Sequence, residues 1–427
     1  ERARSRHAYL EAESLYSQAL PLLPESDDRH RMVAWRGRGL MRYRVSRYDA
    51  IDDLALAREA ARRLGDAQAE VEIVLDESTA FDWTDEYRKS RALVGEAEAL
   101  ARPLAAGRVA DEHAARLIEA RVLLGQGRAM WRFSERKEAL EKLTAAVALA
   151  ERLGDDGYET LVVSLLLLGD LLPWYNETRR AELAFERVIA LCEDHGDRVH
   201  VAVALLNRRQ IWIAHRDLDR AIDDTRQCIQ IARELGLATT TFMGSYNLGE
   251  MFYQAGDPVA AWPHVNRAVE LENRRFSGVG RPVARLLQTR VMAFEGNHEG
   301  ARLWVTEIRS HQERLAGGGA TDGLLMPSED VLLTMVDLFT RDATDEEWSA
   351  LRARAAKYSV EQELIEVADV EARWLARVGR AAEARQKFEE AHRLAERIPN
   401  LMAARLRKGL AELPPDTIAP LRAASNG

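Results

Sequence analysis

The chain has 427 residues, of which 47% are hydrophobic and 30% charged, with a formal net charge of −9. This composition predicts a folded, helix-rich protein and excludes a mostly disordered chain, and the acidic balance argues against a nucleic-acid-binding surface, which needs a basic face. Two cysteines are too few for a disulfide framework, and no apolar run approaches the roughly 20 residues of a membrane span, so we expect a cytoplasmic protein without membrane contact.

A pattern of small and large residues recurs about every 40 residues along the chain. In each unit a small residue, here called the anchor, is followed four residues later by a larger one and seven residues later by a small or apolar one, with some substitutions. These offsets lie on one face of a helix. The anchors, in chain order, are Ala12, Ala50, Ser90, Ala139, Ala181, Ala221, Ala261, Ala301, Thr344 and Ala384.

Two further columns precede the anchors. Nine residues upstream, nine units carry a large apolar residue: Met41, Phe81, Met130, Leu172, Trp212, Phe252, Met292, Met335 and Leu375. Three residues further back, close packing of paired helices favours small side chains, and five units have one: Ser78, Gly127, Gly169, Gly249 and Ala372. Each unit is therefore predicted to be a hairpin of helix A, a short turn and helix B, with glycine as the left-handed cap after several helices B: Gly65, Gly154, Gly196 and Gly236.

The array is predicted to cover residues 1–413. Gly317, Gly318 and Gly319 lie in a segment, residues 315–327, that we expect to be a flexible loop between units. The pair Pro414-Pro415 ends the last helix, and residues 414–427 are expected to form a C-terminal tail.

The repeat resembles the tetratricopeptide repeat (TPR). The match is carried by helix-A and helix-B residues in two units: Leu248, Gly249, Phe252, Ala261 and Ala268, and later Gly379, Ala384, Phe388 and Ala391. The resemblance covers residues 8–413 and implies an all-α, right-handed α-solenoid of about ten TPR-like helical hairpins. The long period, against about 34 residues in the common repeat, resembles the variety found in bacterial STAND-type ATPases, Ser/Thr kinases and CHAT proteases. Because the chain begins with Glu1, we expect that an upstream effector domain belongs to the same polypeptide.

Signatures of catalysis are absent from the sequence. It has no Walker loop, no HExxH, no Gly-x-Ser-x-Gly elbow and no paired CxxC, so we expect no catalytic residue, no cofactor and no metal. His195, His200 and Asp197 are close enough in sequence to suggest a zinc site, but a solvated turn is the preferred interpretation. Cys192 and Cys228 fall at packing positions of helix B and are predicted to lie in the core.

Helices A line the inner wall of a TPR superhelix, so the resemblance places a bound partner there. A polar column eleven residues before the anchor is expected to form a solvated groove: Arg128, Asp170, Gln210, Glu250 and Arg290. Asn207 and Asn247 occupy equivalent places where TPR proteins hold a ligand backbone or carboxylate, although packing or capping would also explain them. Tyr253 and Arg285 complete the predicted groove.

A second candidate surface is aromatic. Four residues near the ends of predicted helices A are expected to form a stripe along one rim: Tyr43, Trp83, Trp131 and Trp174. Exposed aromatic side chains often anchor interfaces. Packing of each residue beneath its own turn is the alternative.

The sequence thus favours a scaffold that binds a protein or peptide through helices A, as the sensor or recruitment arm of a larger bacterial signalling protein. A small-molecule or peptide-pheromone sensor of the TPR type is the alternative. An enzyme with an unrecognised site in the groove is the least favoured hypothesis.

Overall fold

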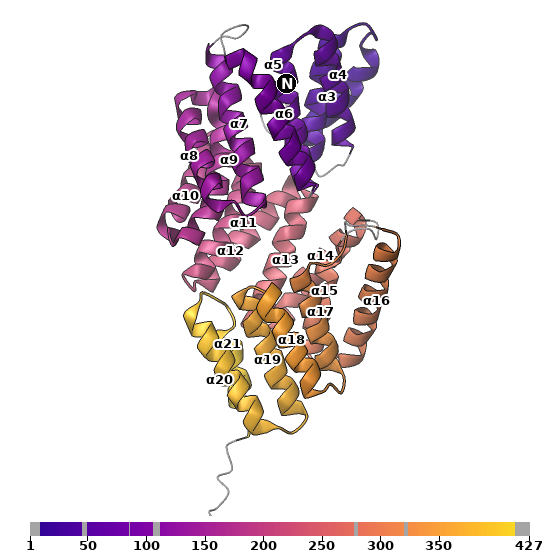
Figure 1. Cartoon of the computed structure of the whole chain (residues 1–427), viewed down its shortest axis with the longest axis vertical. Coiled ribbons are helices and arrows are strands. Elements are labelled where there is room, and N and C mark those ends of the chain that lie inside the picture. Colours follow the sequence, from indigo (N-terminus) through magenta and orange to yellow (C-terminus); the bar gives the residue numbers. More distant parts are fainter. Residues whose placement is uncertain are drawn as a thin grey trace, which may run out of the picture. The chain divides into compact units, whose positions relative to one another are not determined.

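The computed structural model describes residues 9–44, 49–84, 86–105, 112–276, 281–319 and 323–414. Within them it contains twenty α-helices, three short 3-10 helices and no strand, and successive helices run antiparallel (Figure 1). The prediction of an all-α solenoid is confirmed.

The array divides into two compact units instead of one continuous body. The first comprises Glu1–Trp212 and Asp219–Gly244, and the second Ile213–Leu218 and Ser245–Gly427. The boundary falls inside helix α13 (Ala238–Ala255).

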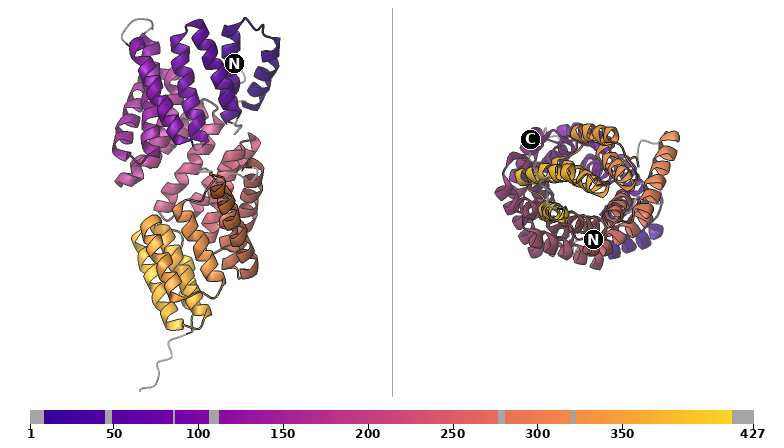
Figure 2. Two further views of the ribbon diagram at one scale, coloured as in Figure 1. Left: turned by 45° about the vertical axis from the view of Figure 1, so that its right-hand side comes forward. Right: turned by 90° about the horizontal axis from the view of Figure 1, so that it is seen from below.

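The first unit begins with one single helix, which is followed by a row of helical hairpins. These are the indigo to magenta helices in the left view of Figure 2. Its elements, apart from the turn that belongs to the second unit, are α2 (Tyr9–Ala19), η1 (Leu20–Leu22), α3 (Asp28–Arg44), α4 (Ala50–Leu64), α5 (Ala67–Trp83), α6 (Tyr87–Ala105), α7 (Glu112–Arg132), α8 (Arg136–Arg152), η2 (Gly154–Gly157), α9 (Tyr158–Leu171), η3 (Leu172–Tyr175), α10 (Thr178–Asp194), α11 (Arg198–Ala214) and α12 (Leu218–Glu234).

The second unit continues the same pattern and ends in a single helix. After α13 come α14 (Pro258–Phe276), α15 (Val283–Phe294), α16 (His298–Gly317), α17 (Pro327–Thr340), α18 (Asp345–Tyr358), α19 (Glu361–Arg377), α20 (Ala381–Arg397) and α21 (Ala403–Glu412). Nine predicted anchors lie in helices B, and the tenth, Thr344, is the N-cap of α18, where its side chain accepts from Glu347 N. The expected loop at residues 315–327 begins later, because α16 runs to Gly317; residues 320–322 and 415–427 lie outside the described residues.

Glycine in helix A allows helix B to pack closely. A Cβ atom on Gly127, Gly169 or Gly249 would lie 2.7, 2.5 or 2.7 Å from an atom of Leu143, Phe185 or Val265, the residue four after the anchor of the same hairpin. The predicted small-residue column is therefore a contact between paired helices. The predicted caps Gly65, Gly154, Gly196 and Gly236 have φ between +59° and +70°, as left-handed helix ends require.

The core of the first unit is most apolar around α9. Among the described residues one segment, Gly154–Tyr175, is long and apolar enough to cross a membrane, but 61% of its apolar 18-residue window is buried inside the molecule. Leu161, Val162 and Leu165 pack there with residues of the neighbouring hairpins, as in the core helix of a globular protein.

We expect Gly169→Ala to lower the stability of the first unit by about 1–3 kcal/mol, because the new methyl group would overlap the Phe185 ring. Gly95→Ala is the matched control: its Cβ would meet nothing within 4 Å, and alanine favours a helix. Thermal unfolding followed by circular dichroism would show a lower Tm for Gly169→Ala and an unchanged or higher Tm for Gly95→Ala. Equal effects would contradict the packing argument.

Candidate partner-binding wall

In the first unit, the faces of helices A that meet one another form an inner wall. Arg36 of α3 donates from Nε to Asp76 of α5 at 2.7 Å, and Arg121 of α7 donates to the same carboxylate at 2.6 Å. An ion pair between Arg44 of α3 and Glu159 of α9 joins helices A that are three hairpins apart. These helices therefore face a common interior.

The single helix α2 occupies part of that interior. Tyr9 is buried in a cluster with residues of α3, and Val199 of α11 packs against this cluster. Burial raises the pKa of Tyr9, with Asp197 and Glu159 among the charges that act on it. The sequence contained no signal for this arrangement, because the repeat pattern describes contacts within a hairpin and between successive hairpins.

Arg128 does not lie in a solvated groove as expected. It is 7% exposed, and its two Nη atoms donate to Thr79 Oγ1 at 3.0 Å and Ser78 Oγ at 3.2 Å. Burial lowers the pKa of its guanidinium. Side chains of α5 bind both Nη atoms of Arg128 inside the unit, so the expectation of solvent exposure is wrong at this position.

Asp170, Asn207 and Gln210 remain accessible on α9 and α11. Asn207 Nδ2 donates to Asp170 Oδ2 at 3.0 Å, and both residues are half-buried. Burial raises the pKa of Asp170 to about 7, against the opposing charges of Arg132 and Arg209. Gln210 is exposed, and in the part of the chain that the structure describes its side chain makes no hydrogen bond. An acid and two amides thus lie on two neighbouring helices of this wall, α9 and α11.

In the second unit a network of ion pairs joins the corresponding faces of helices A. Arg290 of α15 donates from Nε to Glu366 Oε1 of α19 at 2.9 Å and from Nη1 to Glu250 Oε1 of α13 at 3.1 Å. Tyr253 of α13 donates its hydroxyl to Glu366 at 2.8 Å. Arg290 and Tyr253 are only 3% and 1% exposed, so the expectation of a solvated groove is wrong for both.

The terminal helix α21 completes this network. Arg405 donates from Nε to Asp369 Oδ2 of α19 at 2.8 Å and from Nη1 to the carbonyl oxygen of Tyr253 at 3.1 Å. Four helices, α13, α15, α19 and α21, therefore meet through buried charged groups. The side chains of Glu366, Asp369, Arg290 and Arg405 are each 2% exposed or less.

The other groove residues of the second unit have separate surroundings. Glu250 is half-buried and bonded to Arg290, whereas Asn247 is half-buried and has no side-chain hydrogen bond among the described residues. Arg285 stacks over the ring of Trp304 at 3.8 Å and donates to Gln288 at 2.6 Å, so its charge is directed to α16.

The structure brings together two of the four predicted rim residues. The rings of Trp131 and Trp174 are 6.4 Å apart and edge-to-face, and the Arg136 guanidinium lies 3.8 Å from the Trp174 ring centre. Trp174 is 58% exposed and Trp83 43% exposed, whereas Tyr43 is half-buried beside Arg44. No contact links Tyr43 or Trp83 to the tryptophan pair in the described residues.

The histidines and cysteines have structural partners. His195 stacks on Tyr158, and His200 Nδ1 lies 2.5 Å from the buried Asp197 carboxylate. The described residues contain no group of three or more His, Cys, Asp or Glu side chains arranged to hold a metal ion. Cys192 and Cys228 are free and buried, which confirms their predicted place in the core, and burial raises the pKa of each thiol to about 12.

We expect the stability of the first unit to fall as pH rises through neutrality. The native pKa of Asp170 is about 7 and its ordinary value 3.8, so between these values the native state binds more protons than the unfolded chain. The stability that the protonated acid contributes is lost as pH passes about 7. Asp170→Asn, which keeps an acceptor for Asn207, should flatten this dependence by roughly 2–3 kcal/mol between pH 5 and 8. Urea unfolding at several pH values tests this, and identical pH profiles for both proteins would refute it.

Breaking the buried network should destabilise the second unit strongly. Arg290→Met leaves the Glu366 carboxylate buried without its partner, which should cost about 3–5 kcal/mol, whereas the double variant with Glu366→Leu should recover much of the loss. Arg91→Met, which breaks the exposed pair with Glu135, should cost at most about 1 kcal/mol. Guanidinium unfolding measures all three, and equal losses for the two single variants would disprove the role assigned to the network.

Comparisons with known proteins identify the fold. A scan against protein-family models and a search of curated proteins both gave no match. Three solved structures are similar over most of the chain: aspartyl phosphate phosphatase F from Bacillus subtilis (13% identity, 87% of this chain and 94% of that one, TM-score 0.56), the apo form of the quorum sensor NprR from B. thuringiensis (12%, 87% and 99%, 0.53), and a Rap protein complexed with Competence and Sporulation Factor (14%, 91% and 99%, 0.53). At these identities the likeness concerns the fold. The chain therefore has a TPR-like helical-repeat fold.

Proposed function

We propose that this chain is a peptide- or protein-binding solenoid whose partner lies against α9 and α11 of the first unit. One observation carries the proposal. At this register of helix A, the second unit holds Glu250 and Arg290 in an ion pair, whereas Asp170, Asn207 and Gln210 keep surface and hydrogen-bonding capacity for a partner.

The chemistry of these three side chains suits a peptide backbone. An amide donates and accepts at once, as does a peptide bond, and two amides three residues apart on α11 lie on one helix face. Asp170, with its pKa near 7, is able to accept from a backbone N–H when ionised or donate to a carbonyl oxygen when protonated. The exposed Trp174 ring offers an apolar contact four residues further along the chain.

The proposed role is non-catalytic and cytoplasmic. The sequence lacks catalytic motifs, and the solved structures that share the fold include a sensor and a factor-bound Rap protein. Both cysteines are free thiols, which fits a reducing compartment.

A peptide sensor is the second candidate, and the division into two units favours it. The boundary between the units falls inside α13, so each unit contains part of this helix. A ligand that binds the first unit and alters α13 would therefore also change the second unit. The similar structures include a protein described as a quorum sensor. Small-angle scattering with and without a bound peptide distinguishes the candidates: a sensor should change its radius of gyration, and a rigid scaffold should not.

Selection of random twelve-residue peptides displayed on phage against the full chain, followed by fluorescence anisotropy, tests the binding site. We expect Asn207→Ala and Gln210→Ala each to weaken the selected peptides by about tenfold, the worth of one hydrogen bond.

Gln227→Ala is the matched control, because Gln227 is an exposed glutamine on helix B (α12) of the same unit. It should leave the affinity unchanged. Peptides that respond to Gln227→Ala and ignore both wall variants would show that binding uses the outer surface and would overturn the proposal.

A further inference from the structure

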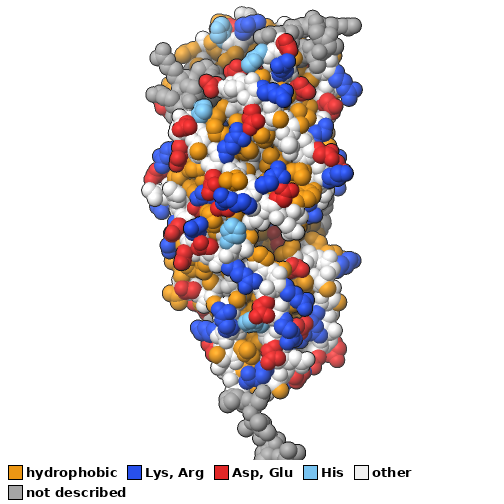
Figure 3. Space-filling view, turned by 90° about the vertical axis from the view of Figure 1, so that its left-hand side faces the viewer, with side chains coloured by type: hydrophobic (Ala, Val, Ile, Leu, Met, Phe, Trp, Pro, Cys, Tyr) orange, Lys and Arg blue, Asp and Glu red, His pale blue; other side chains and the backbone are white. Residues whose placement is uncertain are grey.

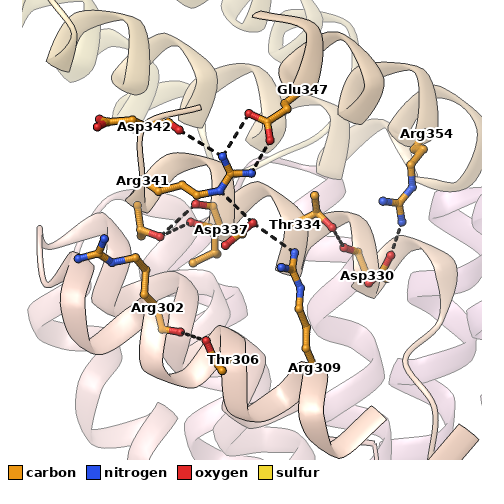
Figure 4. Close-up of polar contacts among 12 residues, drawn as sticks. Arg302, Thr306, Arg309, Asp330, Thr334, Asp337, Arg341, Asp342, Glu347 and Arg354 are labelled. Carbon is orange, nitrogen blue, oxygen red and sulfur yellow. Dashed lines mark hydrogen bonds and ion pairs between the residues drawn. The ribbon is translucent and has the colours of Figure 1, made fainter. Parts of the chain in front are cut away.

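Three arginines lie near the A-to-B turns of successive hairpins in the second unit: Arg302 of α16, Arg341 after α17 and Arg377 at the end of α19. Arg341 is fully paired. It donates to Glu347 at 2.7 and 3.1 Å and to Asp337 at 3.3 Å, as Figure 4 shows. Arg341 therefore has a structural role, and Arg302 and Arg377 differ from it in their partners.

Arg377 contacts only neutral acceptors. Its Nη1 lies 2.6 Å from His298 Nδ1, its Nη2 donates to the carbonyl oxygen of Arg341 at 3.1 Å, and its guanidinium lies 5.2 Å from the Phe339 ring centre. Within the described ranges it forms no ion pair with a carboxylate. Asp342 is the acidic group that attracts it most, but it is exposed and does not pair with it.

Arg302 is likewise uncompensated. It is exposed, and in Figure 4 its guanidinium has no partner, whereas its backbone carbonyl accepts from Thr306 Oγ1 at 3.0 Å. Because it follows His298 by one helical turn, the two side chains are neighbours on the surface of α16. The positive charges of Arg302 and Arg377 each lower the pKa of His298. The charge of Arg302 also lowers the pKa of Arg377, so the two arginines repel each other.

The contact with Arg377 decides which nitrogen of His298 carries the proton. A guanidinium can only donate, so Nδ1 accepts and the hydrogen of the neutral ring is on Nε2. Burial and the two arginines lower the pKa of His298 and keep it neutral at pH 7. The cluster therefore presents donors from three side chains, with two positive charges that lack an anion.

We propose that His298, Arg302 and Arg377 form a binding site for a phosphate-type oxyanion. A tetrahedral anion has acceptor oxygens in several directions, which matches donors that come from a ring and two guanidiniums on two helices. Its charge neutralises both arginines at once. The oxyanion comes either from free inorganic phosphate or from a phosphorylated residue of a bound peptide, and the site is independent of the proposed wall in the first unit.

Titration of the full chain with inorganic phosphate at constant ionic strength, followed by the His298 ring signal in NMR spectra, tests the proposal. We expect a saturable shift with half-saturation at about 1 mM, typical of a few charge-assisted hydrogen bonds. The bound anion should also raise the pKa of His298. A short phosphoserine peptide and its unphosphorylated form make a second titration: tighter binding of the phosphopeptide than of phosphate assigns the anion to a partner, and equal or weaker binding assigns it to the free ion.

Arg302→Ala and Arg377→Ala should each weaken phosphate at least tenfold. Arg309→Ala is the control, because Arg309 lies on the same helix and is paired with Asp337. It removes the same charge and should have no effect. If Arg377→Ala lowers helicity, Arg302→Glu tests the site without disturbing the Phe339 contact. The absence of a saturable response to phosphate and phosphopeptide, or equal weakening by Arg309→Ala, would overturn the proposal.

Discussion

Close approach of helix A to helix B is the constraint on which the rest of this molecule depends. A glycine such as Gly169 lies directly against the ring of a large residue such as Phe185, so the side chain of helix B packs on the backbone of helix A at that point. The contact fixes the rotation of helix A about its own axis. Once that rotation is set, the apolar column faces the hairpin and the polar column eleven residues before the anchor faces the interior of the unit. The candidate wall follows from this geometry.

The polar column eleven residues before the anchor has different surroundings in the two units. In the second unit, buried carboxylates from α19 meet Arg290 and Arg405, and removing either partner would leave a charge in a low-dielectric interior. In the first unit Arg128 is buried as well, but the two later members of the column, Asp170 and Gln210, are neutral or easily neutralised and need no ion partner. A wall of amides and a titrating acid costs little to dehydrate, and a partner is able to replace its water with backbone hydrogen bonds.

Charges on the outer surface follow another rule. On the face in Figure 3, acidic and basic side chains alternate with apolar ones and no sign predominates, so this face offers no extended patch for a polyanion. The cluster of His298, Arg302 and Arg377 stands out because, among the described residues, its two arginines form no ion pair with a carboxylate, whereas Arg309 and Arg341 do. The missing ion pairs, and not the number of positive charges, distinguish this cluster.

The sequence by itself determined the repeat, the hairpins and the core. The anchors, the glycine caps at Gly65 and Gly154, and the buried Cys192 and Cys228 were all predictable, because they depend on contacts within one hairpin or between neighbours, where helical periodicity states which side chains meet. Only the tertiary structure decided which polar residues of helix A stay accessible. Arg290 and Glu366 are 76 residues apart, and Arg405 and Tyr253 are 152 apart. Periodicity gives the face on which a residue lies, and it carries no information about the residue that a distant helix places opposite.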